Sequence, residues 1–267
     1  QKDPAFRKLL AKEKEWDFLS VMQENIFDEY CKFFNFKDKL NVLPKTIIFR
    51  TRGQYETFTE KTGGPKQLLS NGFAGYYNTG LKVLVLYNHF IQTVDEAGNT
   101  GRDKSRQHNN VGDECLYTLF HESLHQFLDM YCSDIPAWFN EGVAVYFELS
   151  SLSSDGYKIT VAGRQFKRES SRYKAVKEKS SHGTLVPWSK FMRLTSKEWL
   201  DIPTDESYPQ AWSMVCFFMR KPELKAMLKK YFDALRDYKG YDYPIEQAFG
   251  KNLEKLEKDY LDFVKKM

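Results

Sequence analysis

The sequence lacks several patterns that identify large classes of protein. Only four of its 267 residues are cysteine, and no two of these are spaced as Cys-x-x-Cys, so a cysteine zinc knuckle is not expected. No apolar run reaches the roughly 18 residues that a membrane span needs. The formal net charge of +4 is too small to indicate a nucleic-acid partner. We therefore expect neither a membrane span nor nucleic-acid binding.

The cysteines and the first residue say little about the compartment. Cys115 and Cys132 fall on one predicted helix, whose rise would separate them by roughly 25 Å and exclude a disulfide between them. We expect buried free thiols. The chain begins with Gln1 rather than methionine, which fits removal of a signal peptide. On that basis we expect an extracytoplasmic or secreted protein, whereas the sequence gives no oligomeric state.

The residues that are abundant predict a packed α+β fold. Hydrophobic residues make up 42% and aromatic residues 16% of the chain, which is enough for a core. The first part predicts a helical segment at 3–35, a strand at 45–51, a helix at 53–64, strands at 73–77 and 82–87, and a loop at 95–112. The later part predicts helices at 113–131, 134–151, 208–220, 222–238 and 245–265.

Strands early and helices late are typical of an α+β arrangement. We expect a small N-terminal mixed sheet above the helix at 113–131 and a mostly helical C-terminal half. We treat 1–267 as one domain, in which 1–44 form a helical cover, 45–132 the sheet and its helix, and 133–267 a helical subdomain.

Residues 121–125 read HESLH, and their spacing suits a metal ion. On a helix, His121 and His125 lie on one face, one turn apart, with Glu122 beside them. Zinc is coordinated by imidazole nitrogens at about 2.0–2.1 Å, and in catalytic sites one coordination position stays open for water or substrate. The ion acidifies a water molecule, whose proton an adjacent carboxylate can take.

A third ligand is expected from the next helix, where Glu141 lies in AWFNEGVA. The break at SDIP can reverse the chain between the two helices, and Gly142 would let them approach closely. The alternative is a chance string on an ordinary helix. Against it, three polar side chains within the apolar run CLYTLFHESLHQFLDMY need partners, and a metal would supply them.

HESLH followed by PAWFNEGVAVYF resembles the gluzincins, the thermolysin-like zinc peptidases. WFNEG is similar to the Trp-Leu-Asn-Glu-Gly segment of zinc aminopeptidases, and the short spacing is most like that of the little-characterised peptidase-MA-like proteins. The resemblance covers about residues 120–150. It implies a zincin-like fold, Zn²⁺ held by His121, His125 and Glu141, and Glu122 as general base.

A second resemblance concerns YPQAWSMVCFFM (208–219), which is similar to an aminopeptidase helix that starts with a tyrosine. By that resemblance, the hydroxyl of Tyr208 stabilises the oxyanion of the tetrahedral intermediate. The alternative is that Tyr208 only packs a helix start.

The hairpin GFAGYYN (72–78) departs from the aminopeptidases, whose Gly-x-Met-Glu-Asn strand carries a glutamate for the substrate's free amine. An edge strand without an acid suits pairing with an extended peptide that is cut internally. Tyr76 and Tyr77 would then line a groove, although cross-strand packing explains such aromatics as well.

The remaining polar features have simpler explanations. His108 lies in a polar loop shortly before the helix at 113–131, where it could contact a substrate, and a solvated loop histidine is the alternative. His89 and His182 suggest no role. Glu148 is a candidate for the acid that orients a metal-binding histidine, and a surface glutamate is the alternative. The basic segment at 164–179 favours an acidic partner or a polyanionic surface, and a solvated helix or loop is the alternative.

We expect zinc-dependent hydrolysis of peptide bonds in a peptide or protein substrate, by an endopeptidase rather than an aminopeptidase. Two alternatives stay open. One is a catalytically silent protein that keeps the zinc site for binding or as a scaffold. The other is a hydrolase of a non-peptide amide, such as a cell-wall fragment.

Overall fold

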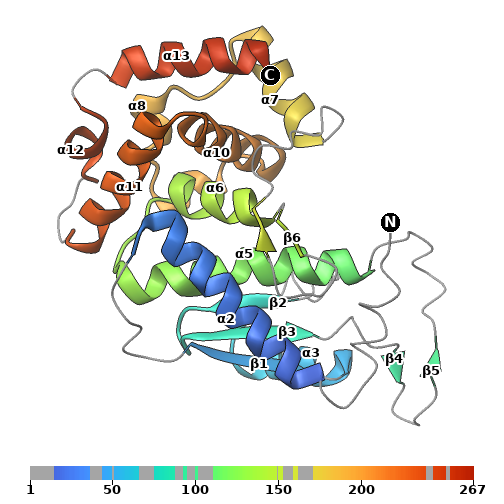
Figure 1. Ribbon diagram of the computed structural model, residues 1–267. Coiled ribbons are helices and arrows are strands. Elements are labelled where there is room, and N and C mark those ends of the chain that lie inside the picture. Colours follow the sequence, from blue (N-terminus) through green and yellow to red (C-terminus); the bar gives the residue numbers. More distant parts are fainter. Residues whose placement is uncertain are drawn as a thin grey trace. The chain divides into compact units, whose positions relative to one another are not determined.

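The computed structural model of the protein confirms the α+β class. It describes residues 15–36, 44–49, 51–65, 75–87, 93–94, 100–101, 111–148, 150–152, 159–161, 171–238, 243–250 and 253–267. Within these residues, a small three-stranded sheet comes first and a helical C-terminal half follows (Figure 1).

The chain forms two compact units. Unit 1 comprises Gln1–Phe127 and Ser150–Thr160, and unit 2 comprises Leu128–Leu149 and Val161–Met267. The described elements of unit 1 are α2 (Glu15–Phe34), β1 (Lys45–Phe49), α3 (Arg52–Lys61), β2 (Gly75–Asn78), β3 (Val83–Tyr87), β4 (Thr93–Val94), β5 (Thr100–Gly101), most of α5 (Val111–Tyr131), β6 (Ser151–Leu152) and β7 (Ile159–Thr160). Unit 2 begins with the last residues of α5. Its other described elements are α6 (Ala137–Glu148), α7 (Ser171–His182), α8 (Trp188–Phe191), α9 (Ser196–Leu200), α10 (Thr204–Met219), α11 (Pro222–Arg236), α12 (Ile245–Phe249) and α13 (Leu253–Lys266).

The main sheet of unit 1 is mixed, in the order β1-β3-β2. β1 runs parallel to β3, and β2 runs antiparallel to it with Tyr76 opposite Val85. Every residue of β3 is buried, as expected for a central strand covered on both faces. In the described part of the chain β2 pairs with β3 alone, so its outer side is an edge.

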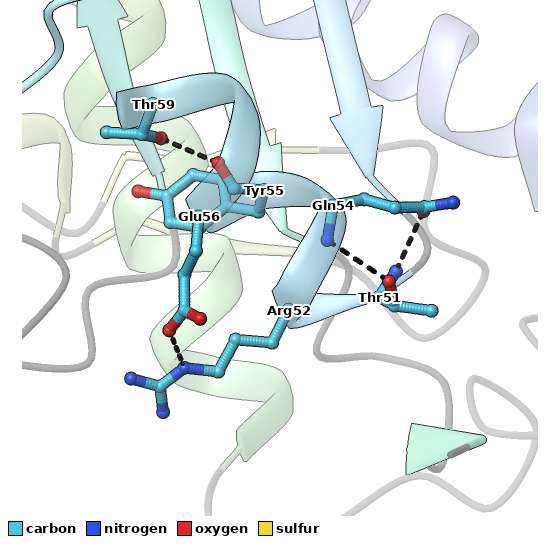
Figure 2. Close-up of polar contacts among 6 residues, drawn as sticks. All are labelled: Thr51, Arg52, Gln54, Tyr55, Glu56 and Thr59. Carbon is cyan, nitrogen blue, oxygen red and sulfur yellow. Dashed lines mark hydrogen bonds and ion pairs between the residues drawn. The ribbon is translucent and has the colours of Figure 1, made fainter. Parts of the chain in front are cut away.

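Helix α3 covers one face of this sheet. Its Tyr55 packs into a buried cluster with Tyr76 and alternate residues of β3, among them Val85. The helix begins with a capping box that Figure 2 shows: the Thr51 hydroxyl accepts a hydrogen bond from the Gln54 backbone N–H at 3.3 Å, and the Gln54 side chain accepts one from the Thr51 N–H at 3.4 Å. These bonds satisfy backbone donors that the first turn leaves without helical partners.

Helix α2 packs against α5 through aromatic side chains. The hydroxyl of fully buried Tyr30 donates a hydrogen bond to the Phe120 carbonyl at 2.6 Å. The ring of Phe127 contacts four aromatic rings of the α2 region, namely Phe27, Tyr30, Phe34 and Phe36. This packing fixes the Phe127 side of α5 in the core of unit 1.

In unit 2, α10 packs closely against α6. A Cβ atom added to Gly142 would lie 2.7 Å from the carbonyl oxygen of Ala211, so glycine permits this approach of the two helices. The sequence had suggested that Gly142 serves the approach of α6 to α5, but the close contact is with α10. Elsewhere in unit 2, Trp138 stacks on Tyr231, with ring centroids 5.6 Å apart.

The structure differs from the predicted elements in several places. The loop predicted at 95–112 contains strand β5, which pairs with β4, and helix α5 begins within it at Val111. The helix predicted at 245–265 is two helices, because Gly250 has a φ of +79° that interrupts them. The helix predicted to begin at residue 208 begins at Thr204. The short helix α9 was not predicted, although Thr195 and Glu198 form a capping box at its start.

The described cysteines are thiols, as predicted: Cys132 and Cys216 are buried, and Cys31 is half-buried. Burial raises the pKa of the Cys132 thiol to about 12. No helix in the described ranges combines the length and the apolar character that crossing a bilayer requires.

We predict that Gly142→Ala destabilises unit 2 by about 1–3 kcal/mol, because the new methyl group would overlap the backbone of α10. Urea or thermal unfolding measures the change. Gly80→Ala is the control, since its Cβ would meet only the Asn78 side chain at 3.5 Å. Equal stability of the Gly142→Ala protein and the unmodified protein would contradict the close packing.

Candidate metal centre

His121 and His125 lie one turn apart on the same side of α5, as their spacing predicts. Their ring centroids are 4.8 Å apart, and the rings are nearly perpendicular at 82°. Both are half-buried, whereas Leu124 and Phe127 on other sides of the helix are fully buried. The helix thus keeps two imidazoles accessible while its apolar residues form the core.

The helix is held in place at both ends of the HESLH segment. At one end, Phe120 accepts the hydrogen bond from Tyr30. At the other, the side-chain N–H of buried Gln126 donates to the Lys45 carbonyl at 2.8 Å. The Gln126 oxygen accepts in turn from Gln23 at 3.3 Å. These bonds limit rotation and sliding of α5, so the imidazoles have a defined direction.

Helix α6 supplies a carboxylate to the same place. Its first turn begins after Pro136, whose carbonyl accepts from the N–H groups of Phe139 and Asn140 at 3.0 and 3.1 Å. Half-buried Glu141 follows one turn later. One ligand atom each of His121, His125 and Glu141 lie within 4.8 Å of one another. The three residues thus form a group that could hold a metal ion, and their role as ligands stays a prediction.

This donor set is one that a divalent metal ion takes. Two neutral imidazole nitrogens and a carboxylate oxygen are the ligands of several catalytic zinc sites, which leave a fourth position open. Among the residues that the structure describes, it is the sole group of at least three histidine, cysteine or acidic residues placed to hold an ion. The chemistry of the side chains therefore fits the ion that the sequence suggested.

Glu122 is directed towards the edge of the sheet. Its Oε2 accepts a hydrogen bond from the backbone N–H of Tyr77 on β2 at 2.8 Å. The pKa of the Tyr55 hydroxyl is raised, chiefly by burial and further by the neighbouring Tyr76 and the charge of Glu122. The carboxylate adjacent to His121 thus lies beside β2 and near α3.

Tyr208 lies in the second turn of α10, rather than at its start. It is half-buried, and its ring centroid is 5.8 Å from that of Trp199. One turn further along α10, Ala211 contacts Gly142, the residue after Glu141. The oxyanion role of Tyr208 stays a prediction.

The other residues singled out in the sequence have different positions. Glu148 forms an ion pair with Arg172 at 2.9 Å, which ties α6 to α7. Tyr76 is buried in the cluster with Tyr55, so it packs across the strands rather than lining a groove. His182 is exposed at the end of α7. His89 and His108 lie outside the described residues.

Two contacts around the HESLH segment could not be predicted from the sequence. The donor to Glu122 is a backbone N–H, which every residue except proline carries, so no side-chain pattern indicates it. Gln126 immediately follows His125, but a glutamine on a helix gives no sign that it will bond to a strand carbonyl.

Comparison with known proteins adds one similarity. A family model described as a protein of unknown function, DUF1570, matches residues 116–237, just under half of the chain. The matched region extends from α5 into unit 2 and includes all three residues of the candidate metal group. No curated protein and no solved structure matches the chain.

We predict that Glu141→Gln lowers the affinity for zinc by about 100-fold or more. Loss of a residue that only hydrogen-bonds to a metal ligand already lowers metal affinity by about 10–100-fold, and loss of the ligand itself should cost more. Competition with a chromophoric chelator measures the affinity, and the rise in melting temperature on adding zinc provides a second reading. Glu148→Gln, on the same helix, is the matched control and keeps the affinity. Equal zinc binding by the Glu141→Gln and unmodified proteins would contradict the assignment.

Proposed function

We propose that the protein is a zinc-dependent peptidase of gluzincin type. The observation that carries the proposal is the meeting of His121, His125 and Glu141 beside Glu122. The resemblance of HESLH and WFNEG to gluzincins supports it, as does a mixed sheet whose edge strand β2 touches the general-base candidate. On this proposal the fold is zincin-like.

His121, His125 and Glu141 would hold the ion, which supplies polarisation of a carbonyl group and acidification of a water molecule when bound. Glu122 takes the proton of the attacking water and later delivers it to the leaving amine. Tyr208 donates a hydrogen bond to the oxyanion of the tetrahedral intermediate, which a phenol can do while uncharged.

The edge strand favours internal cleavage of a peptide. β2 reads Gly-Tyr-Tyr-Asn, with no acidic residue to bind a free amine. Extended peptides bind such edges by main-chain hydrogen bonds, which do not require a chain terminus. We therefore propose endopeptidase rather than aminopeptidase activity.

The decisive variant is Glu122→Gln, which keeps the shape of the side chain and removes the base. We expect the zinc-loaded variant to bind the metal as the unmodified protein does and to hydrolyse casein about 10²–10⁴-fold more slowly. Product peptides measured by mass spectrometry give the rate. Undiminished hydrolysis would contradict the role of Glu122.

The unmodified protein distinguishes the alternatives in the same assay. If it binds zinc but cleaves neither casein nor a peptide library, the peptidase proposal fails. Cleavage of an amide in a cell-wall fragment would then identify a different hydrolase. Absence of that reaction as well would leave the silent binding protein.

We further predict that Tyr208→Phe lowers kcat by about 10²-fold and leaves KM nearly unchanged, because the lost hydrogen bond is made to the oxyanion rather than to the substrate. Tyr238→Phe removes a hydroxyl just after the end of α11 and serves as the control. A Tyr208→Phe enzyme with the kcat of the control would return Tyr208 to a packing role.

A further inference from the structure

We propose that the backbone amide of Tyr77 is a positioning group that fixes the direction of the Glu122 carboxylate. The inference rests on the proposed function, in which Glu122 is the base, and adds a residue that acts through it. It starts from the 2.8 Å hydrogen bond between the Tyr77 N–H and Oε2 of Glu122.

The direction of this N–H follows from the strand pairing. In an antiparallel pair, successive residues of an edge strand point their N–H groups alternately towards the partner and away from it. Because Tyr77 donates to Glu122 on α5, its N–H points outward, and those of Tyr76 and Asn78 point towards β3.

Contacts along its length hold the strand that presents this donor. A Cβ on Gly75 would lie 2.6 Å from the Val85 carbonyl oxygen, so β2 and β3 are in close contact there. Tyr76 anchors the strand in the cluster with Tyr55. At the other end, the Asn78 side chain accepts a hydrogen bond from the Leu81 N–H at 2.9 Å and closes the turn. A donor on such a strand keeps its place.

The bond gives the two carboxylate oxygens of Glu122 different surroundings. A glutamate on a helix surface samples several rotamers, and ordering it costs about 1–2 kcal/mol of side-chain entropy. A hydrogen bond to a charged oxygen is stronger than a neutral one, so the Tyr77 amide can hold Oε2. Oε1 is then the oxygen that can receive the proton of the attacking water.

The same bond limits how a peptide can pair with β2. A peptide lying along the edge would find the outward N–H of Tyr77 already used by Glu122. It would therefore have to form its main-chain hydrogen bonds with other outward-pointing backbone groups of β2. The N–H of Tyr77 would stay bonded to Glu122, the proposed base.

Hydrogen exchange tests the bond without any assay of activity. We expect the Tyr77 amide to exchange about tenfold or more slowly in the unmodified protein than in Glu122→Ala, because the variant lacks the carboxylate that accepts its hydrogen bond. Glu122→Gln, whose carbonyl can still accept, should keep most of the protection. The inward-facing Tyr76 amide is the internal control. Equal exchange of the Tyr77 amide in all three proteins would overturn the proposal.

A backbone ester tests the consequence for catalysis. Replacing tyrosine 77 by its α-hydroxy acid removes the N–H and keeps the side chain. We expect kcat to fall about 10–100-fold with KM nearly unchanged. The same ester at position 76 removes an N–H that faces β3, and should lower stability without this loss of kcat. An ester at 77 with undiminished kcat would overturn the positioning role.

The two measurements separate this inference from the proposed function. If the zinc-loaded unmodified protein cleaves no peptide, the peptidase proposal fails, and the exchange measurement alone decides whether the Tyr77 amide holds Glu122. If peptides are cleaved but the Tyr77 amide is unprotected, the function stands and the positioning inference is wrong.

Discussion

Two hydrogen bonds hold helix α5 in unit 1, and the chemistry of the candidate site depends on them. The Tyr30 hydroxyl binds the Phe120 carbonyl, and the Gln126 side chain binds the Lys45 carbonyl. They lie immediately before and immediately after HESLH, so this segment cannot rotate without breaking one of them. Aromatic packing around Phe127 adds apolar burial on the same helix. The directions of both imidazoles and of Glu122 are consequences of that placement.

Helices α5 and α6 each carry polar side chains of the candidate metal group among apolar residues. His121, His125 and Glu141 are half-buried, and together they offer two imidazole nitrogens and a carboxylate oxygen. On the proposed function, a divalent cation would be coordinated by all three side chains. Glu122 has a different partner, because its carboxylate accepts the backbone hydrogen bond from Tyr77.

The sequence predicted local features well and three-dimensional neighbours less well. The spacing of His121 and His125 is a property of one helix, so it could be predicted from periodicity, and Glu141 followed from the next helix. The mixed sheet and the edge strand were also expected. The partner of Gly142 was not, because small residues show that a close approach occurs but not with which helix. The Tyr77 contact was missed because a backbone donor leaves no mark in the sequence.

The central claim is that His121, His125 and Glu141 bind one zinc ion together. Anomalous diffraction at the zinc absorption edge, from crystals of the zinc-loaded protein, tests it most directly. We expect a single strong peak about 2.0–2.2 Å from a nitrogen of each histidine and a carboxylate oxygen of Glu141. A zinc-loaded crystal with no peak at these residues, or with its zinc bound only by other side chains, would contradict it.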